Sequence, residues 1–140
     1  MREKYIKSIK FKIYDFVVAN YQKVDGFMLG DLPYNCKCHL NAVQKVKEGK
    51  AVKVFVCVAI RKDNWKDIIV HFINQLEDGT FQDNTWGWLY EGYNYYLVKE
   101  IPESEFNSID DVLVGLQASL IKSHSNPIIR KLFRIKLDIV

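Results

Sequence analysis

Hydrophobic residues recur at three- and four-residue steps in two long stretches near the ends of the chain, and this spacing predicts amphipathic helices. The first stretch runs from residue 3 to about residue 21. The second covers residues 104–123, opens at Ser108 or Asp110, and ends near Asn126-Pro127, because proline rarely continues a helix. Helices are therefore expected at both ends of the chain.

A shorter helix is predicted within residues 34–50, "YNCKCHLNAVQKVKEGK". Asn35 is a suitable N-cap, and Gly49 is suited to the position just beyond the last turn. Cys38 would then lie in the first turn of this helix.

Between the helices, the pattern changes to that of strands. Residues 51–60, "AVKVFVCVAI", are almost all apolar and rich in β-branched side chains, which predicts a central strand covered on both faces. Cys57 lies inside this strand and is expected to act as a small, inert core residue.

The remaining strands are expected to form an antiparallel meander with the first. In chain order, the sequence predicts a polar turn at 61–67, a strand at 68–74, a turn around Asp78-Gly79, a strand at 81–85 and a strand at 93–101. The predicted fold class is α+β, with N-terminal helices packed on a central antiparallel sheet and a helix at the C-terminal end.

Composition favours one compact domain over residues 1–140, since 49% of the residues are hydrophobic and 26% are charged. Twenty basic and 17 acidic residues give a net charge of +3, too balanced for a protein that binds nucleic acid through phosphate contacts. Basic residues cluster in 1–12 and 128–136, where a solvated face is the simpler interpretation.

No apolar run is long enough to cross a bilayer, and charged residues interrupt the start of the chain, so neither a membrane span nor a secretory signal is expected. The expected location is the cytoplasm. The three cysteines would be reduced there, and a structural disulfide is not expected.

Three types of reactive residue follow one another in a suggestive order: Cys38 at a helix start, His71 in a strand, and Asp83 or Asn84 across the next turn. A helix N-terminus stabilises a thiolate and offers N–H donors to an oxyanion. A strand histidine can take up and return the proton. A neighbouring carboxylate or amide fixes the histidine tautomer.

This arrangement resembles the papain-like cysteine peptidase superfamily. "CHLNA" at 38–42 is similar to the start of the nucleophile helix in a group of short phage- and plasmid-type proteins, and "IVHFIN" at 69–74 is similar to the strand that carries the base. "DGTFQDNTWGW" at 78–88 is similar to the strand of the third member, and its "NTWG" resembles the Asn-Ser-Trp-Gly segment of papain-type enzymes.

The resemblance implies a papain-like fold and a thiol hydrolase or acyltransferase, with peptide or isopeptide cleavage the favoured reaction. It implies no cofactor and a peptide or protein substrate, and it suggests a phage or mobile-element protein that acts on a host target. The runner-up is a protein without enzymatic activity on the same scaffold, such as an inhibitor or an interaction module.

Two assignments stay open between neighbours. Cys38 is favoured over Cys36 as the nucleophile because it directly precedes the "HLNA" segment. Asp83 is favoured over Asn84 as the residue that orients His71, because a charged partner stabilises an imidazolium more than an amide does.

Supporting roles fall to residues around these three. No glutamine lies a few residues before Cys38, so Asn35 or Tyr34 is the candidate for the second oxyanion donor. Trp86 is expected mainly to pack in the core, where it would shield the hydrogen bond between His71 and its acidic partner from water.

A metal site is disfavoured. Cys36, Cys38, His39 and His71 could supply four zinc ligands, but a Cys-x-Cys-His run lacks the usual gap between thiols. A redox pair is disfavoured for the same short spacing. His39 and His124 have no evident partners and are expected at the surface.

Overall fold

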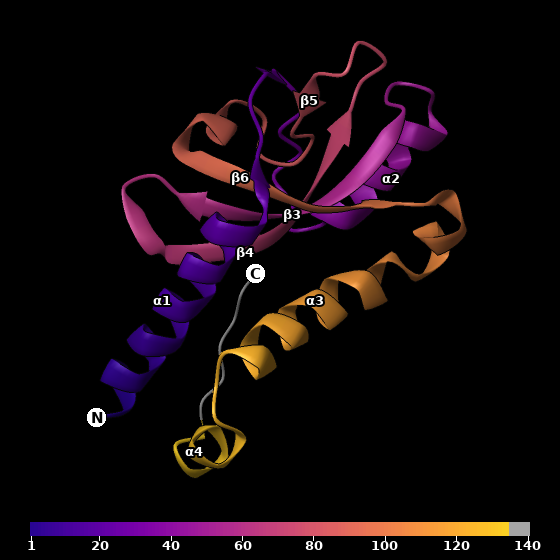
Figure 1. Cartoon of the computed structure of the whole chain (residues 1–140). Coiled ribbons are helices and arrows are strands. Elements are labelled where there is room, and N and C mark those ends of the chain that lie inside the picture. The colour runs from indigo at the N-terminus through magenta and orange to yellow at the C-terminus, as the bar shows by residue number, and fades with distance from the viewer. Residues whose placement is uncertain (135–140) are drawn as a thin grey trace.

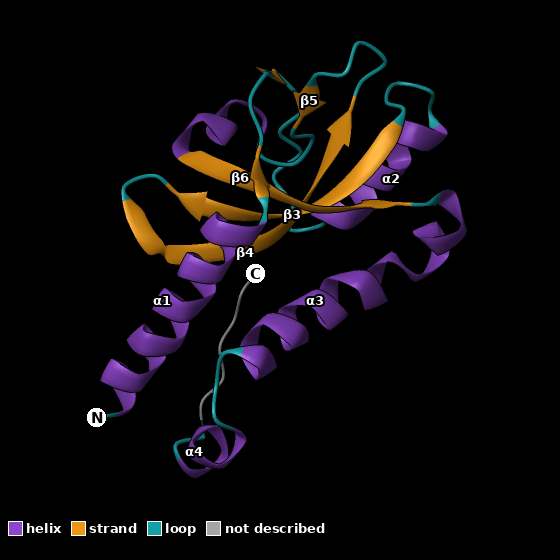
Figure 2. Ribbon diagram, viewed as in Figure 1, coloured by secondary structure: helices purple, strands orange, loops and turns teal. Residues whose placement is uncertain are grey.

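The computed structural model describes residues 1–134, which form a six-stranded sheet with helices (Figure 1). The strands are β1 (Gln22–Lys23), β2 (Phe27–Met28), β3 (Lys53–Arg61), β4 (Asn64–Gln75), β5 (Phe81–Gln82) and β6 (Tyr93–Ile101). The helices are α1 (Arg2–Asn20), α2 (Cys38–Lys47), α3 (Ile109–Ser123) and α4 (Pro127–Leu132), with 3-10 helices η1 (Gly87–Gly92) and η2 (Glu103–Ser108). The predicted α+β class is confirmed (Figure 2).

The sheet has the order β1-β6-β3-β4-β5-β2, so the predicted meander is wrong. The strand β6 does not continue from β5 but returns to pair with β3, whose other edge is occupied by β4. The outer edge of β5 takes β2 instead, in a parallel pair. All other strand pairs are antiparallel, as expected.

Two strand boundaries differ from the predictions. The polar stretch 61–67 is mostly strand, with Arg61 opposite Asn64, because Trp65 packs against Phe11 of α1 at a ring distance of 5.6 Å. The strand predicted at 81–85 ends at Gln82, because the Asp83 carboxylate accepts backbone N–H groups further along and turns the chain.

The helices match their patterns closely except at the start of α2. This helix begins at Cys38 with Lys37 at the N-cap position, so Asn35 is not the cap that the sequence predicts. Gly49 has φ +72° just beyond the helix, in agreement with its predicted role. The predicted helix 104–123 divides into η2 and α3, with Ser108 at the N-cap position of α3.

The two faces of the sheet are covered differently. Even-numbered side chains of β3 and β4, such as Val56, Val58 and Phe72, form one apolar core with α1, α2 and α3. Odd-numbered side chains face the other way, into a smaller core with Tyr95 of β6. Cys57 belongs to this second core and is fully buried, as predicted.

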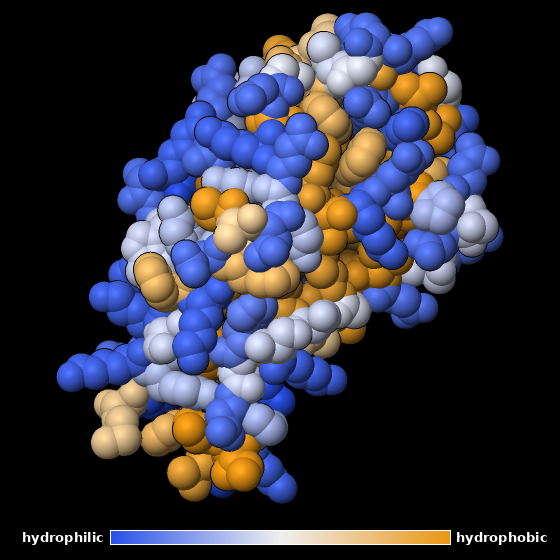
Figure 3. Space-filling model, viewed as in Figure 1, coloured by the Kyte–Doolittle hydropathy of each residue, from blue (hydrophilic) through white to orange (hydrophobic). Residues whose placement is uncertain are grey.

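The helical end of the molecule leaves apolar side chains exposed. Figure 1 shows α1 and α3 extending to the same side of the sheet, with α4 beyond the far end of α3. Figure 3 shows apolar atoms gathered over this end, where Ile128 and Leu132 of α4 are exposed. No helix within residues 1–134 is both long and apolar enough for a membrane span. The predicted basic stretch 128–136 extends past the described residues.

Candidate active site

Cys38 is the first residue of α2, and no side chain caps this end of the helix. The N–H groups of a first helical turn have no partners within the helix. Cys38 therefore lies at the end of α2 where free N–H groups and the helix dipole stabilise a negative charge.

His71 lies on β4 opposite Cys57 of β3, and its side chain is buried on the sheet face away from the helices. Its Nε2 atom donates a hydrogen bond of 2.9 Å to Oδ2 of Asp83. Since Nε2 is committed to Asp83, Nδ1 is the nitrogen left for a second partner. The side chain that partners His71 is thus Asp83, the favoured one of the two neighbours.

Asp83 is fully buried, and both oxygens of its carboxylate accept hydrogen bonds that fix its position. The backbone N–H groups of Thr85 and Trp86 both donate to Oδ1 at 2.9 Å. The Tyr95 hydroxyl donates to Oδ2 at 2.5 Å, beside His71. Burial opposes ionisation, but the charge and hydrogen bond of His71 and these further donors lower the pKa of Asp83. Asp83 is therefore a stable anion behind the imidazole.

Trp86 lies flat on the His71 ring, with centroids 3.7 Å apart and planes 14° from parallel. Tyr93 packs against Trp86 in turn, at 4.4 Å. The indole covers one side of the imidazole, which matches the shielding position predicted for Trp86.

Cys38 and His71 approach each other at an open edge of the sheet. Cys38 packs with the helical core, whereas His71 belongs to the opposite face. Among the described residues, β5 pairs with β4 only at Asn74 and Gln75, so no strand covers the outer edge at Phe72. The thiol reaches this edge, and the Phe72 backbone hydrogen-bonds to it.

The environment of Cys38 favours the thiolate. Burial raises the pKa of the thiol, but hydrogen bonds to His39 and His71, the charge of His71 and the Phe72 backbone lower it overall to about 6. Cys36, two residues earlier, is exposed, and Cys57 is buried with its pKa raised by desolvation and by the charge of Asp83. Of the three cysteines, Cys38 is thus the one placed to react.

His71 is held in the charged form. Burial alone lowers the pKa of this imidazole, but the charge and hydrogen bond of Asp83, followed by those of Cys38, raise it to about 9. A thiol with a pKa near 6 beside an imidazole with a pKa near 9 gives an ion pair at neutral pH.

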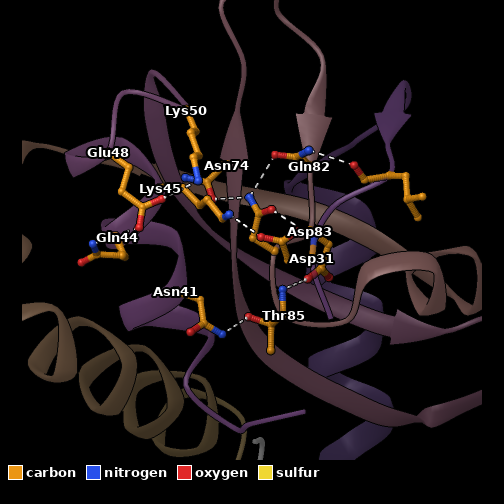
Figure 4. Close-up of polar contacts among 12 residues, drawn as sticks. Asp31, Asn41, Gln44, Lys45, Glu48, Lys50, Asn74, Gln82, Asp83 and Thr85 are labelled. Carbon is orange, nitrogen blue, oxygen red and sulfur yellow. Dashed lines mark hydrogen bonds and ion pairs between the residues drawn. The ribbon is translucent and has the colours of Figure 1, made fainter. Parts of the chain in front are cut away.

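Asn35 lies at the same site, but in a different role from the predicted cap. Its Oδ1 accepts hydrogen bonds from the backbone of Lys37 and from Nδ2 of Asn41. Nδ2 of Asn41 also donates to Oγ1 of Thr85 at 3.0 Å, and Figure 4 shows these two side chains pointing toward one another. Asn41 thus ties α2 to the loop of Asp83. Sequence analysis missed this link, although "HLNA" contains the residue.

Asn84 has a structural place instead of contacting His71. It donates to the side chain of Asn74 at 2.9 Å, and its Oδ1 accepts from the Asp31 backbone. The Asp31 carboxylate forms an ion pair with Lys45 of α2. This network joins the loop before α2 to the segment after β5.

A pocket of about 210 Å³ opens beside the Cys38 sulfur. Apolar side chains from the sheet and helices form most of its wall, with Asn35 and Thr85 as the neutral polar groups. Its lining is Asn35, Cys36, Cys38, Ile69, Val70, His71, Thr85, Trp86, Tyr93 and Leu113. Apart from the Cys38–His71 pair itself, this wall carries no charged side chain among the described residues.

The predictions for the other histidines are wrong. His39 is 8% exposed and pairs with Asp110 of α3 through Nε2 at 2.5 Å. His124 is half-buried, donates from Nδ1 to the Leu120 carbonyl at 2.7 Å, and lies 4.9 Å from the Phe16 ring. Both partners are distant in sequence or part of the backbone, so composition gave no sign of them. Within residues 1–134, no cluster of three or more acidic, histidine or cysteine side chains is arranged to hold a metal.

No family model, curated protein or solved structure matches this chain.

Proposed function

We propose that this protein is a papain-like thiol hydrolase or acyltransferase with Cys38 as nucleophile, His71 as acid and base, and Asp83 as the residue that orients His71. The observation that carries the proposal is the continuous chain of contacts from the Cys38 thiol through His71 to the buried Asp83. A nucleophile, a base and an orienting group in contact form the arrangement that acyl transfer requires.

In the first half of the reaction, the Cys38 thiolate attacks an acyl carbon and forms a C–S bond. The carbonyl oxygen becomes an oxyanion, for which the free N–H groups at the start of α2 are the nearest backbone donors. His71 then gives its Nδ1 proton to the departing amine as the C–N bond breaks, leaving a thioester.

In the second half, neutral His71 takes a proton from water or from an acceptor amine, which attacks the thioester. Collapse of this intermediate releases the acid or the new amide and restores the thiolate beside a protonated His71. Asp83 remains charged throughout and holds the ring so that Nδ1 faces the sulfur.

Asn35 is the candidate for the second oxyanion donor. Its Oδ1 is already used by Lys37 and Asn41, whereas its Nδ2 makes a long contact of 3.4 Å to Asn41 and lines the pocket. An amide anchored through its oxygen presents its nitrogen to a substrate oxygen. Tyr34, the other candidate, is 90% exposed.

A peptide or isopeptide bond is the favoured substrate, in a protein of the host of a phage or mobile element. The loop 26–34, which would fill the groove in a protein that only binds a partner, contributes no lining residue to the pocket. An open pocket beside an ion-paired thiol favours the enzyme over the interaction module.

Labelling with iodoacetamide and with a peptidyl vinyl sulfone tests the proposal. We expect Cys38 to react at pH 7 much faster than exposed Cys36, with His71→Ala removing vinyl sulfone labelling, and Cys36→Ser serving as the matched control that leaves it intact. Equal labelling of Cys36 and Cys38, unchanged by His71→Ala, would refute the enzyme.

A further inference from the structure

A second imidazole lies next to the proposed nucleophile. His39 follows Cys38 in the first turn of α2, and its side chain is only 10% exposed. Its Nε2 is paired with Oδ1 of Asp110 at 2.5 Å. The proposed function assigns no role to this pair.

The second nitrogen of His39 has an unusual environment. Nδ1 is buried and makes no well-aligned hydrogen bond to any described residue, so the interaction of the ring with the neighbouring Cys38 thiol does not satisfy it fully. A buried donor or acceptor without a partner is costly, so such an atom needs a physical reason. The titratable groups that act on His39 are the Cys38 thiol of its own helix and Asp110 of α3, while β4 presents the Phe72 ring, 6.1 Å away.

We propose that His39, kept protonated by Asp110, is a positioning residue that holds a positive charge beside the Cys38 sulfur from the helical side, independently of His71 and Asp83. The catalytic importance of this inference rests on the proposed function, whereas the experiment that tests it does not. The sulfur would then lie between two imidazoles, one on α2 and one on β4.

Electrostatics supports this assignment. The interaction with Cys38 raises the pKa of His39 despite the opposing effect of burial, and Asp110 raises it further. Burial raises the pKa of Cys38, but the hydrogen bond with His39 lowers it, as do the hydrogen bond and the charge of His71. A charge on His39 stabilises the free thiolate before it attacks the acyl carbon, and again when cleavage of the thioester releases it. Between these two steps the sulfur is bound in the thioester and carries no charge.

The direction in which one substitution moves the pKa of Cys38 tests the proposal. Asp110 is itself an anion, so if it acted directly on the thiolate, Asp110→Asn would lower the pKa of Cys38. If Asp110 acts through His39, the neutral variant loses the imidazolium, and the pKa of Cys38 rises instead. The two mechanisms therefore move the pKa in opposite directions.

The experiment measures the rate of iodoacetamide alkylation against pH in the Cys36→Ser background, where Cys38 is the reactive thiol. We expect His39→Gln to move the midpoint upward by about one pH unit or more, which is a tenfold loss of thiolate below the midpoint. Asp110→Asn should move it in the same direction, and the double variant should move it no further than His39→Gln alone. Asp111→Asn, the same charge change one residue along α3, should leave it in place.

Circular dichroism and thermal unfolding identify variants that fail to fold, and the His39 ring proton shifts in NMR give a second readout. We expect the His39 titration to move to lower pH in Asp110→Asn and in Cys38→Ser. An unchanged or lowered Cys38 midpoint in folded His39→Gln would overturn the inference. If the midpoints shift as expected but no acyl substrate is turned over, the proposed function fails and this inference stands.

Discussion

At the scale of single residues, three thiols of the same chemical type differ in reactivity because their environments differ. Cys57 is sealed in the smaller core, Cys36 is in solvent, and Cys38 lies between imidazoles at a helix start. Burial opposes ionisation in Cys57 and Cys38 alike, but Cys38 also has hydrogen bonds from two imidazoles and the charge of His71, which lower its pKa, whereas the charge of Asp83 raises the pKa of Cys57 further.

The pH dependence of hydrolysis should follow the ion pair. The thiol is protonated below a pKa of about 6, and the imidazolium is lost above a pKa of about 9. We therefore expect kcat/KM to rise through the first value and fall through the second, as a bell-shaped profile. Alkylation of Cys38 needs the thiolate alone, so its rate should show no loss at the alkaline end. A single rise near pH 9 in both measurements would contradict the ion pair.

Replacing Asp83 should affect both reactivity and stability. Asp83→Asn removes the charge that keeps His71 protonated, and we expect kcat/KM to fall by about 10³-fold or more. A buried carboxylate with four donors also holds the loop after β5, so unfolding in urea should show a loss of about 2–4 kcal/mol.

Asp78→Asn is the control for this variant. Asp78 lies on the exposed hairpin turn and accepts from Thr80, so the same charge change there should leave kcat/KM unaltered. Full activity in a folded Asp83→Asn variant would remove Asp83 from the proposed triad.

The relative positions of single residues were predictable where chain order was informative, and they were not where a partner lay far away. The structure brings together Cys38, His71 and Asp83, as the order of helix, strand and turn predicts. It contradicts the surface position of His39, because the contact with Asp110 needs α3 folded against α2. No local pattern carries that information.

At the scale of elements, the loop between β2 and α2 is held against the segment after β5. A Cβ atom at Gly30 would lie 2.3 Å from the Asp83 carbonyl oxygen, so no larger residue fits there without backbone movement. This close approach places Asp31 within reach of the Asn84 side chain. Glycine is needed here for space.

Gly30→Ala should therefore separate the two segments. We expect the free energy of unfolding in urea to fall by about 1–3 kcal/mol, and the alkylation of Cys38 at pH 7 to become slower. Gly92→Ala is the matched control, since a Cβ there meets nothing within 4 Å. Equal stability of the two variants would show that the loop tolerates the displacement.

The link from α2 to the Asp83 loop can be cut at Asn41. Asn41→Ala removes the hydrogen bonds to Asn35 and Thr85, so the second oxyanion donor loses its anchor. We expect kcat to fall about tenfold, from lost positioning, with the pH profile unchanged. Gln44→Ala, on the same helix but bonded to Glu48 at the surface, should keep the original kcat.

Elements were predictable where local pattern decided them. The strand 93–101 and the long helices follow their hydrophobic periods. The order of strands was not predictable, since pairing of β6 with β3 and of β2 with β5 depends on contacts between distant segments. The two-residue strands β1 and β2 are too short to show any period.

At the scale of the whole molecule, α1 covers the helical face of the sheet although it contributes nothing to the candidate pocket. Ile9, Ile13 and Val17 are buried in the same core as the strands. The packing predicts one cooperative unit that includes α1.

The Ile13→Ala variant tests whether α1 unfolds together with the rest of the molecule. We expect a loss of about 2–5 kcal/mol in a single unfolding transition that circular dichroism and tryptophan fluorescence report together. The folded variant should keep the alkylation rate of Cys38. Val18→Ala, at an exposed position of α1, should change the stability by about 0.5 kcal/mol or less. Two separate transitions would show that α1 is not part of the same folding unit.

The hydrogen bond between the Cys38 sulfur and the Phe72 backbone has a consequence for sequence variation and for protein design. Its donor belongs to the main chain, so every amino acid except proline supplies it, and exchanges at position 72 cannot abolish it by altering a side chain. Replacing that amide by an ester in semisynthetic protein would delete this single donor. A different scaffold that carries only the grafted side chains of Cys38, His71 and Asp83 would also lack this donor. It would need a strand with an unpaired edge at the same place to supply one.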